Sequence, residues 1–336
     1  MRRPFSCRGT RIAATAIAAA ASSLVFAAAS SRDSRTFELK ENIVFKGFPE
    51  GARSARIWLP VPSSDEHQSV EIESISSPVA TRRTTDPEYG NESLYLELPD
   101  PARRDVRFDL AFRATRKEYS TDPRSSAAGG PRPPGLGRYL RADRLVPIDG
   151  KFRKLSDEIT AGQPTALGKA RAIYDYVFKT MKYDKSGEGW GRGDSLWACD
   201  SRRGNCTDFH SVFISLMRAQ GIPARFEIGF PLASAPAAEI PGYHCWAEFY
   251  LDGPGWIPVD ISEAWKAPAR HDYFFGNLDA NRIRFSTGRD VTLSPPQKDA
   301  PLNYFVYPYA EVDGKPFTGS LERTIRYRET PVSAAK

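Results

Sequence analysis

The sequence predicts an α+β protein whose second half is preceded by an antiparallel β-sandwich. Apolar and polar residues alternate through most of residues 36–115, as they do in half-buried strands. The second half opens with apolar residues at three- and four-residue steps, which is typical of helices, and then returns to strand patterns. Helices followed by strands, without regular alternation of the two, favour an α+β arrangement.

The first 29 residues have the layout of a secretory signal peptide. Four arginines precede the weakly apolar run 12–29, which ends in three alanines and meets an A-x-A cleavage pattern. We therefore expect a cleaved leader, no membrane anchor after cleavage, and a periplasmic or extracellular protein. Arg2-Arg3 followed by Phe5 leaves the twin-arginine route open beside the general secretory route.

Charge and cysteine content narrow the class of partner. The formal net charge of +6 falls to +2 without the four leader arginines, so nucleic acid is not an expected partner.

The mature chain would keep Cys199, Cys206 and Cys245. An odd number in an exported protein indicates a reactive thiol or an intermolecular bond. Cys199 and Cys245 either pair or remain reduced, and we favour the reduced state.

Four segments follow from composition: the signal peptide (1–29), a β-sandwich-like domain (30–119), a linker rich in Pro, Gly and Ser (120–140), and a second domain (141–336) that includes closing strands at 304–309 and 324–327. The sandwich strands are expected at 36–45, 55–61, 70–75, 94–98 and 106–115.

The second domain contains the elements that carry chemistry. Thr165 is the expected cap of a helix over 166–181. Asn205 caps another helix, with Asp208 three residues on, and Gly221 ends it. Cys206 therefore lies in a first helical turn. Strands are expected at 225–230, 243–251 and 256–261.

Cys206 has the setting of a nucleophile. Unpaired N–H groups and the positive end of the helix dipole both lower the pKa of a thiol. Alternation along the strand 243–251 places His244, Trp246 and Glu248 on one face and Cys245 on the other, in the core. If residues 252–254 form the turn, Leu251 faces Gly255, and Asp260 becomes a diagonal neighbour of His244.

Three segments together resemble the transglutaminase-like core: Arg203-Gly204-Asn205-Cys206-Thr207-Asp208-Phe209 with Leu216 to Arg225, Tyr243-His244-Cys245-Trp246-Ala247-Glu248, and Gly255-Trp256-Ile257-Pro258-Val259-Asp260. The resemblance is strong over about 60 residues. It implies a papain-like fold in which Cys206 is the nucleophile, His244 the acid and base, and Asp260 the group that orients the histidine.

That resemblance implies a cysteine-dependent acyltransferase or hydrolase, of protease or amidase type, that forms a thioester from a carboxamide or peptide bond. The Cys206 N–H is one expected oxyanion donor, and Trp197 and Trp246 are candidates for oxyanion or substrate contacts. The expected substrate is a protein, a peptide or a cell-envelope polymer. No cofactor and no metal are expected, since the chain has no acidic calcium-loop pattern.

Two rival readings remain. Cys206, His210, His244 and Cys245 could form a zinc site, although adjacent strand residues point to opposite faces and no C-x-x-C occurs. If there is no zinc site, His210 is a helix-surface residue or a support behind the catalytic residues. Alternatively, the protein binds a cell-envelope polymer or acts as a scaffold without catalysis.

Overall fold

The computed structural model describes residues 33–101, 105–125 and 133–330. The expected signal peptide lies outside the described residues, as does the middle of the expected linker. The described residues belong to one compact unit. The described part of the linker contains a short strand, β7 (Tyr119–Ser120), and a 3-10 helix, η1 (Leu136–Leu140).

The N-terminal strands, together with strands from later in the chain, form two five-stranded antiparallel sheets. In spatial order, the first consists of β11 (Ala237–Glu239), β18 (Ser320–Glu329), β1 (Ser34–Lys46), β6 (Val106–Lys117) and β3 (Gln68–Ser76). The second consists of β17 (Lys315–Pro316), β16 (Tyr309–Val312), β2 (Ser54–Val61), β5 (Glu92–Pro99) and β4 (Arg82–Thr85). All five expected sandwich strands are present, and β4 is additional.

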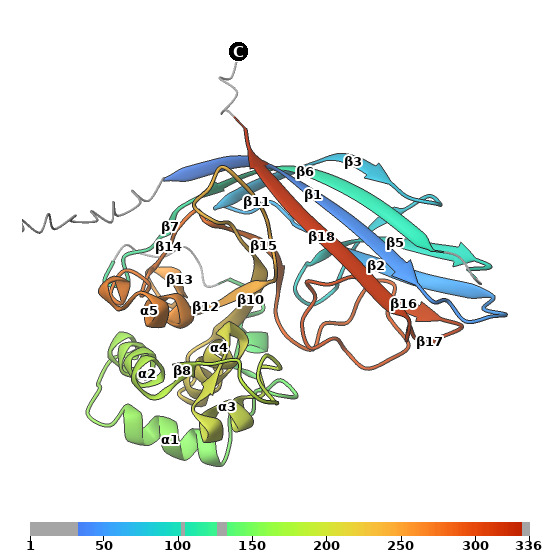
Figure 1. The fold of residues 1–336 in the computed structure, drawn as a ribbon. Coiled ribbons are helices and arrows are strands. Elements are labelled where there is room, and N and C mark those ends of the chain that lie inside the picture. The colour runs from blue at the N-terminus through green and yellow to red at the C-terminus, as the bar shows by residue number, and fades with distance from the viewer. Residues whose placement is uncertain (1–32, 102–104, 126–132, 331–336) are drawn as a thin grey trace, which may run out of the picture. The chain divides into compact units, whose positions relative to one another are not determined.

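The closing strands belong to these two sheets, which corrects the expectation that they complete the second domain. β18 pairs with β1 from Phe37↔Glu329 to Lys46↔Ser320, and β16 pairs with β2. Figure 1 shows β18 running alongside β1, although the two are almost 300 positions apart in the chain. Local alternation predicts a strand but not its partner, because pairing depends on distant residues.

The second half of the chain contains the helices. They are α1 (Lys151–Ile159), α2 (Ala166–Thr180), α3 (Ser195–Ser201), α4 (Cys206–Ala219), α5 (Ile261–Lys266) and the 3-10 helix η2 (Pro268–Arg270). The caps of α2 and α4 are as expected, since the Thr165 hydroxyl accepts from the Gly168 N–H and Asn205 with Asp208 forms a full capping box. Helices α1, α3 and α5 were not expected from the sequence.

A four-stranded antiparallel sheet packs against α4. Its order is β13 (Gly255–Val259), β12 (His244–Leu251), β10 (Ala224–Pro231) and β15 (Arg282–Thr287). Figure 1 shows α4 next to β10 and β12. Leu251 faces Gly255 and Ala247 faces Val259, so the register expected for this hairpin is confirmed. The last strand ends at Val259 and not at 261, because Asp260 caps α5.

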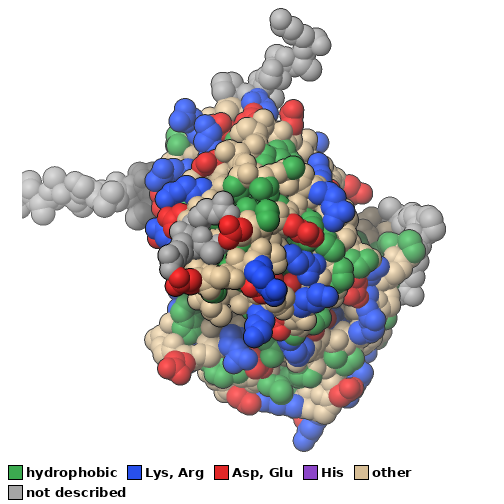
Figure 2. Space-filling view, turned by 90° about the vertical axis from the view of Figure 1, so that its right-hand side faces the viewer, with side chains coloured by type: hydrophobic (Ala, Val, Ile, Leu, Met, Phe, Trp, Pro, Cys, Tyr) green, Lys and Arg blue, Asp and Glu red, His purple; other side chains and the backbone are tan. Residues whose placement is uncertain are grey.

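Short pairs of strands complete the description: β14 (Asn277–Leu278) pairs with β7, and β8 (Lys182–Tyr183) pairs in parallel with β9 (Arg203–Gly204). Among the described residues, no helix is both long and apolar enough to span a bilayer. On the face shown in Figure 2, acidic and basic side chains are interspersed, with hydrophobic side chains between them in small groups.

Candidate functional site

Cys206 is the first residue of α4, and its position is set by the cap of that helix. The Asn205 side chain accepts from the Thr207 N–H at 2.9 Å, and the Asp208 carboxylate accepts from the Asn205 N–H at 2.9 Å. Both bonds satisfy donors that a helix start leaves unpaired. The Cys206 side chain is therefore held at the positive end of a helix of 14 residues.

The same Asp208 carboxylate also anchors the glycine-rich loop before α3. It accepts from the N–H of Gly191 at 2.7 Å and from that of Gly193 at 3.0 Å. Gly204 has φ +148°, and a Cβ there would lie 2.3 Å from Asp208 Oδ2. Glycine at 204 thus makes room for this carboxylate.

His244 and Asp260 meet at the ends of β12 and β13. His244 Nε2 lies 2.7 Å from Asp260 Oδ2, and both side chains are buried. The other carboxylate oxygen, Oδ1, accepts from the Glu263 N–H and the Ser262 hydroxyl, each at 3.0 Å. Because these bonds also cap α5, they hold the Asp260 carboxylate in place independently of its bond to the imidazole.

The pKa values of Cys206 and His244 are shifted in opposite directions, and the charge on each residue favours the charge on the other. Burial opposes ionisation of the Cys206 thiol, but interactions with Cys245 and His244, and the charge of His244, lower its pKa well below the usual value. Burial also disfavours the imidazolium of His244, yet the Asp260 charge and hydrogen bond, with Cys206, raise the His244 pKa to about 10. Since Nε2 is bound to Asp260, Nδ1 is the ring nitrogen left for Cys206. This arrangement favours a thiolate–imidazolium pair.

Arg282 is a further member of the site that the sequence did not identify. It begins β15, and its Nη1 donates to Asp260 Oδ2 at 2.8 Å. Burial disfavours the carboxylate of Asp260, but His244 and then Arg282 lower its pKa well below the usual value. Arg282 was one of several aromatic and basic residues after Asp260, and no local pattern separates it from the others.

His210 is fully buried and bridges Cys206 to the start of α5, so it is not a helix-surface residue. Its Nδ1 lies 2.8 Å from the Cys206 carbonyl oxygen, and its Nε2 lies 3.1 Å from the Ile261 nitrogen. The Ile261 N–H can only donate, so Nε2 accepts and Nδ1–H donates. Burial lowers the pKa of His210, in keeping with a neutral ring.

Cys199, Cys206 and Cys245 are all free thiols. Cys245 packs inward against α4, as its strand face predicts, but this places its sulfur near the site: it lies 3.7 Å from the Thr207 hydroxyl and 3.9 Å from His210 Nδ1. Within the ranges that the structure describes, no group of three or more His, Cys, Asp or Glu side chains could hold a metal ion. Both nitrogens of His210 are already used by backbone groups.

The two tryptophan candidates lie in different surroundings. Trp197 belongs to α3 and packs under Gly189, with the Arg203 guanidinium 5.6 Å from its ring. Trp246 is next to His244, with ring centroids 6.3 Å apart, and Arg282 lies 5.1 Å from its ring. The buried Trp246 Nε1 has no hydrogen-bond partner among the described residues.

Tyrosines and an ion pair surround the thiol. Burial and then the Cys206 charge raise the pKa of Tyr183 to about 12. Glu263 lies 4.0 Å from His244 Nε2 and pairs with Lys266. The Cys206 residue is only 2% exposed.

The fold and the Cys206, His244 and Asp260 arrangement define a papain-like α+β protein. Residues 153–261 match the model of the Transglutaminase-like superfamily. An uncharacterized protein of Haemophilus influenzae is 30% identical over 322 residues, which are 83% of this chain and 86% of that protein. The uncharacterized protein YebA of Bacillus subtilis is 23% identical over 148 residues, 40% of this chain and 20% of YebA.

The fold is also found in a solved structure from Cytophaga hutchinsonii, provisionally described as a cysteine protease. That structure matches with a TM-score of 0.61 and 17% identity, covering 90% of this chain and 93% of its own. This protein belongs to the transglutaminase-like superfamily, and the resemblance found in the three sequence segments is confirmed. The fold class, a transglutaminase-like core with a β-rich N-terminal region, is confirmed as well.

Proposed function

We propose that this protein is an exported cysteine-dependent enzyme that transfers acyl groups from carboxamide or peptide bonds through a thioester on Cys206. The observation that carries the proposal is the buried series Cys206, His244 and Asp260, in which the thiol pKa is lowered and the imidazole pKa is raised. A thiolate and a proton donor in contact are the two groups that acyl transfer requires. Residues 1–29 support export by their signal-peptide layout.

The proposed reaction runs in two balanced steps. The Cys206 thiolate attacks the carbonyl carbon, the C–N bond breaks, and the amine leaves with the proton of the His244 imidazolium. The neutral His244 then takes a proton from water or from a primary amine, which attacks the thioester and releases the thiolate. Water gives hydrolysis, and an amine gives transamidation. Asp260 holds the imidazole through Nε2 in both steps.

Negative charge on the carbonyl oxygen needs hydrogen-bond donors. As the first residue of α4, Cys206 has an N–H with no acceptor inside the helix. This group is our candidate for one oxyanion donor. The Trp246 N–H is buried and has no partner among the described residues, and we do not assign it to the oxyanion.

The direct test is to incubate the purified protein with a glutamine-rich protein, with and without a primary amine. Ammonia release alone indicates hydrolysis, and amine incorporation indicates transamidation. Cys206→Ala is expected to abolish both products. Cys199→Ala is the matched control and is expected to retain them, because Cys199 lies on α3, away from His244 and Asp260. Activity that survives in Cys206→Ala would refute the proposal.

A polymer-binding or scaffold protein without turnover is the second candidate, favoured by the 2% exposure of Cys206. Alkylation with iodoacetamide at about pH 6 separates the two, since only a thiolate reacts quickly there. Rapid, selective modification of Cys206 supports the enzyme. Equal, slow modification of all three cysteines supports the scaffold.

A further inference from the structure

A cavity of about 770 Å³ lies against the four-stranded sheet that carries His244, on the face opposite α4. Side chains from this sheet and from the N-terminal strands line it, and they include Arg116, Arg225, Arg284, Trp246, Glu248 and His67. We call it the arginine cavity. Its volume is in the range of small-molecule sites.

Two of the three arginines in this cavity are neutralised by nearby carboxylates. Arg225 lies 2.6 Å from Glu248, and Arg284 lies 2.9 Å from Asp65. These ion pairs connect strands β10 and β12, and β15 and the loop before β3. Both arginines are therefore accounted for as structural groups.

Arg116 is different, because it is buried and none of the described carboxylates lies within ion-pair distance of it. The residue is 2% exposed. Its Nη1 is 3.5 Å from Gln68 Oε1, at the limit of a hydrogen bond, and its Nε has no partner. Burial lowers the pKa of Arg116 to about 10, although the nearby charge of Asp65 acts in the opposite direction. An uncompensated buried charge is costly.

The neighbours of Arg116 supply the rest of a ligand site. Trp246 also lines the cavity, and its buried Nε1 has no acceptor. His67 stacks on Tyr119 with centroids 3.5 Å apart, and burial followed by the Arg116 charge lowers its pKa, so it adds no charge near neutral pH. Tyr139 and Trp256 add aromatic walls.

The balance of charge selects the class of ligand. One cation is unpaired, while Asp65, Glu66 and Glu248 also line the cavity and repel a doubly charged group. A single carboxylate can accept from a guanidinium and an indole N–H together. Aromatic walls suit an apolar or aromatic body next to that carboxylate.

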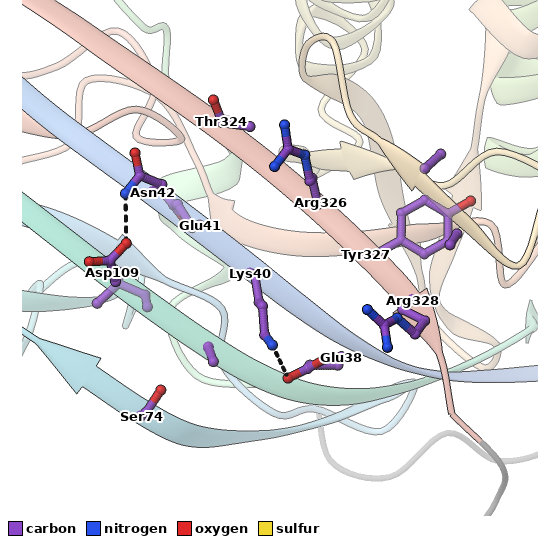
Figure 3. A pocket seen from close by; sticks show the side chains of 14 residues that line it. Glu38, Lys40, Glu41, Asn42, Ser74, Asp109, Thr324, Arg326, Tyr327 and Arg328 are labelled. Atoms are coloured by element: carbon purple, nitrogen blue, oxygen red, sulfur yellow. Dashed lines mark hydrogen bonds and ion pairs between the residues drawn. The ribbon is translucent and has the colours of Figure 1, made fainter.

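Another cavity, on the outer side of the first sheet, shows the contrast. It has a volume of about 600 Å³. Its polar and charged side chains bind one another: Lys40 lies 2.9 Å from Glu38, and Asn42 donates to Asp109 at 2.6 Å (Figure 3). Arg326, at its edge, pairs with Glu239 at 3.0 Å. These pairs leave no comparable buried cation.

We propose that the arginine cavity binds a small monocarboxylate, with Arg116 as the anchor of the carboxylate and Trp246 as the second donor. The site is separate from Cys206, because it faces the side of the sheet opposite α4. Binding there is measured without any turnover, so its test does not depend on the acyl-transfer reaction.

The test measures heat of binding of phenylacetate to the full chain, with neutral phenylacetamide as the matched probe. Wild-type protein is expected to bind phenylacetate at least about tenfold more tightly than the amide. Arg116→Gln is expected to lose this preference and Arg116→Lys to retain part of it. Arg113→Gln, on the outer face of the same strand, is expected to retain all of it.

Thermal unfolding separates a ligand site from a merely structural arginine. Without ligand, Arg116→Gln is expected to melt at the same or a higher temperature, because an unpaired buried charge is removed. The proposal would be overturned by any one of three results: equal affinity for phenylacetate and phenylacetamide, no detectable phenylacetate binding, or unchanged phenylacetate binding in Arg116→Gln. If Arg116→Gln does not fold, the comparison of probes and Arg116→Lys still decide the question.

Discussion

His210 Nδ1 lies 2.8 Å from the carbonyl oxygen of Cys206, and its other ring nitrogen lies 3.1 Å from the Ile261 nitrogen. One neutral ring thus joins the residue that carries the sulfur to the residue that follows Asp260. His210 touches none of the reacting atoms in the proposed reaction, so we regard it as a positioning residue. It couples the first turn of α4 to the first turn of α5.

Replacing His210 is expected to displace the thiol from His244. His210→Phe keeps a ring but leaves the Ile261 N–H unpaired, at about 1–3 kcal/mol, and removes the side-chain bond to the Cys206 carbonyl. We expect Cys206 alkylation at about pH 6 to fall about tenfold or more relative to its rate at about pH 9, because less thiolate remains at the lower pH. His271→Phe, away from the triad, is the control and leaves that ratio unchanged. An unchanged ratio in His210→Phe would mean that His210 only fills space.

The pH dependence of Cys206 alkylation tests the role of Asp260. After burial, which acts in the opposite direction, Asp260 is the main cause that raises the His244 pKa to about 10. The imidazolium that stabilises the thiolate is therefore present below about pH 10 and lost above it. We expect wild-type alkylation to stay fast from the mildly acidic range upward. In Asp260→Asn the His244 pKa falls, so the Cys206 pKa rises and the acidic limb moves to higher pH.

Asp272→Asn is the control for that experiment, because Asp272 is exposed and pairs with Arg171 and not with His244. Its alkylation profile should match that of the wild type. If the pH profiles of Cys206 alkylation coincide for Asp260→Asn and the wild type, Asp260 has no role in the proposed mechanism.

The cap of α4 is expected to affect both stability and reactivity. Asn205→Ala removes the bond to the Thr207 N–H and the one to the Tyr243 hydroxyl, so we expect a loss of about 1–2 kcal/mol in the free energy of unfolding. Thr165→Ala removes the cap of α2 at a comparable cost. Urea unfolding measures both losses. Only Asn205→Ala should also slow Cys206 alkylation, and a similar effect of Thr165→Ala would argue against local control by the cap.

Arg282 is expected to matter far more for stability than an exposed arginine. Arg282→Gln leaves the buried Asp260 with His244 as its main counter-charge, and breaking a buried pair costs about 3–5 kcal/mol. Arg326→Gln, on β18, breaks an exposed pair and should cost less than about 1 kcal/mol. Chemical denaturation compares the two variants. Equal losses would show that Arg282 contributes no more than a surface charge.

Local sequence patterns predicted much of the site. The capping box of Asn205 and Asp208 involves four consecutive residues, so its signal lies within one turn. The turn between Leu251 and Gly255 sets the register of the hairpin, and the paired residues follow by counting. Short helices were missed: α5 has six residues and begins directly after a strand, so it offers too few positions for periodicity.

By itself, the sequence determined the family, the position of Cys206 at a helix start, and the hairpin that leads from His244 toward Asp260. Only the tertiary structure decided that β18 closes the first sheet beside β1, that Arg282 binds Asp260, and that Arg116 is buried with no described carboxylate within ion-pair distance. The physical reason is how far apart in the sequence the interacting residues lie. Caps and turns are stabilised by neighbours in the chain, whereas strand partners and buried charges depend on contacts between residues far apart in sequence.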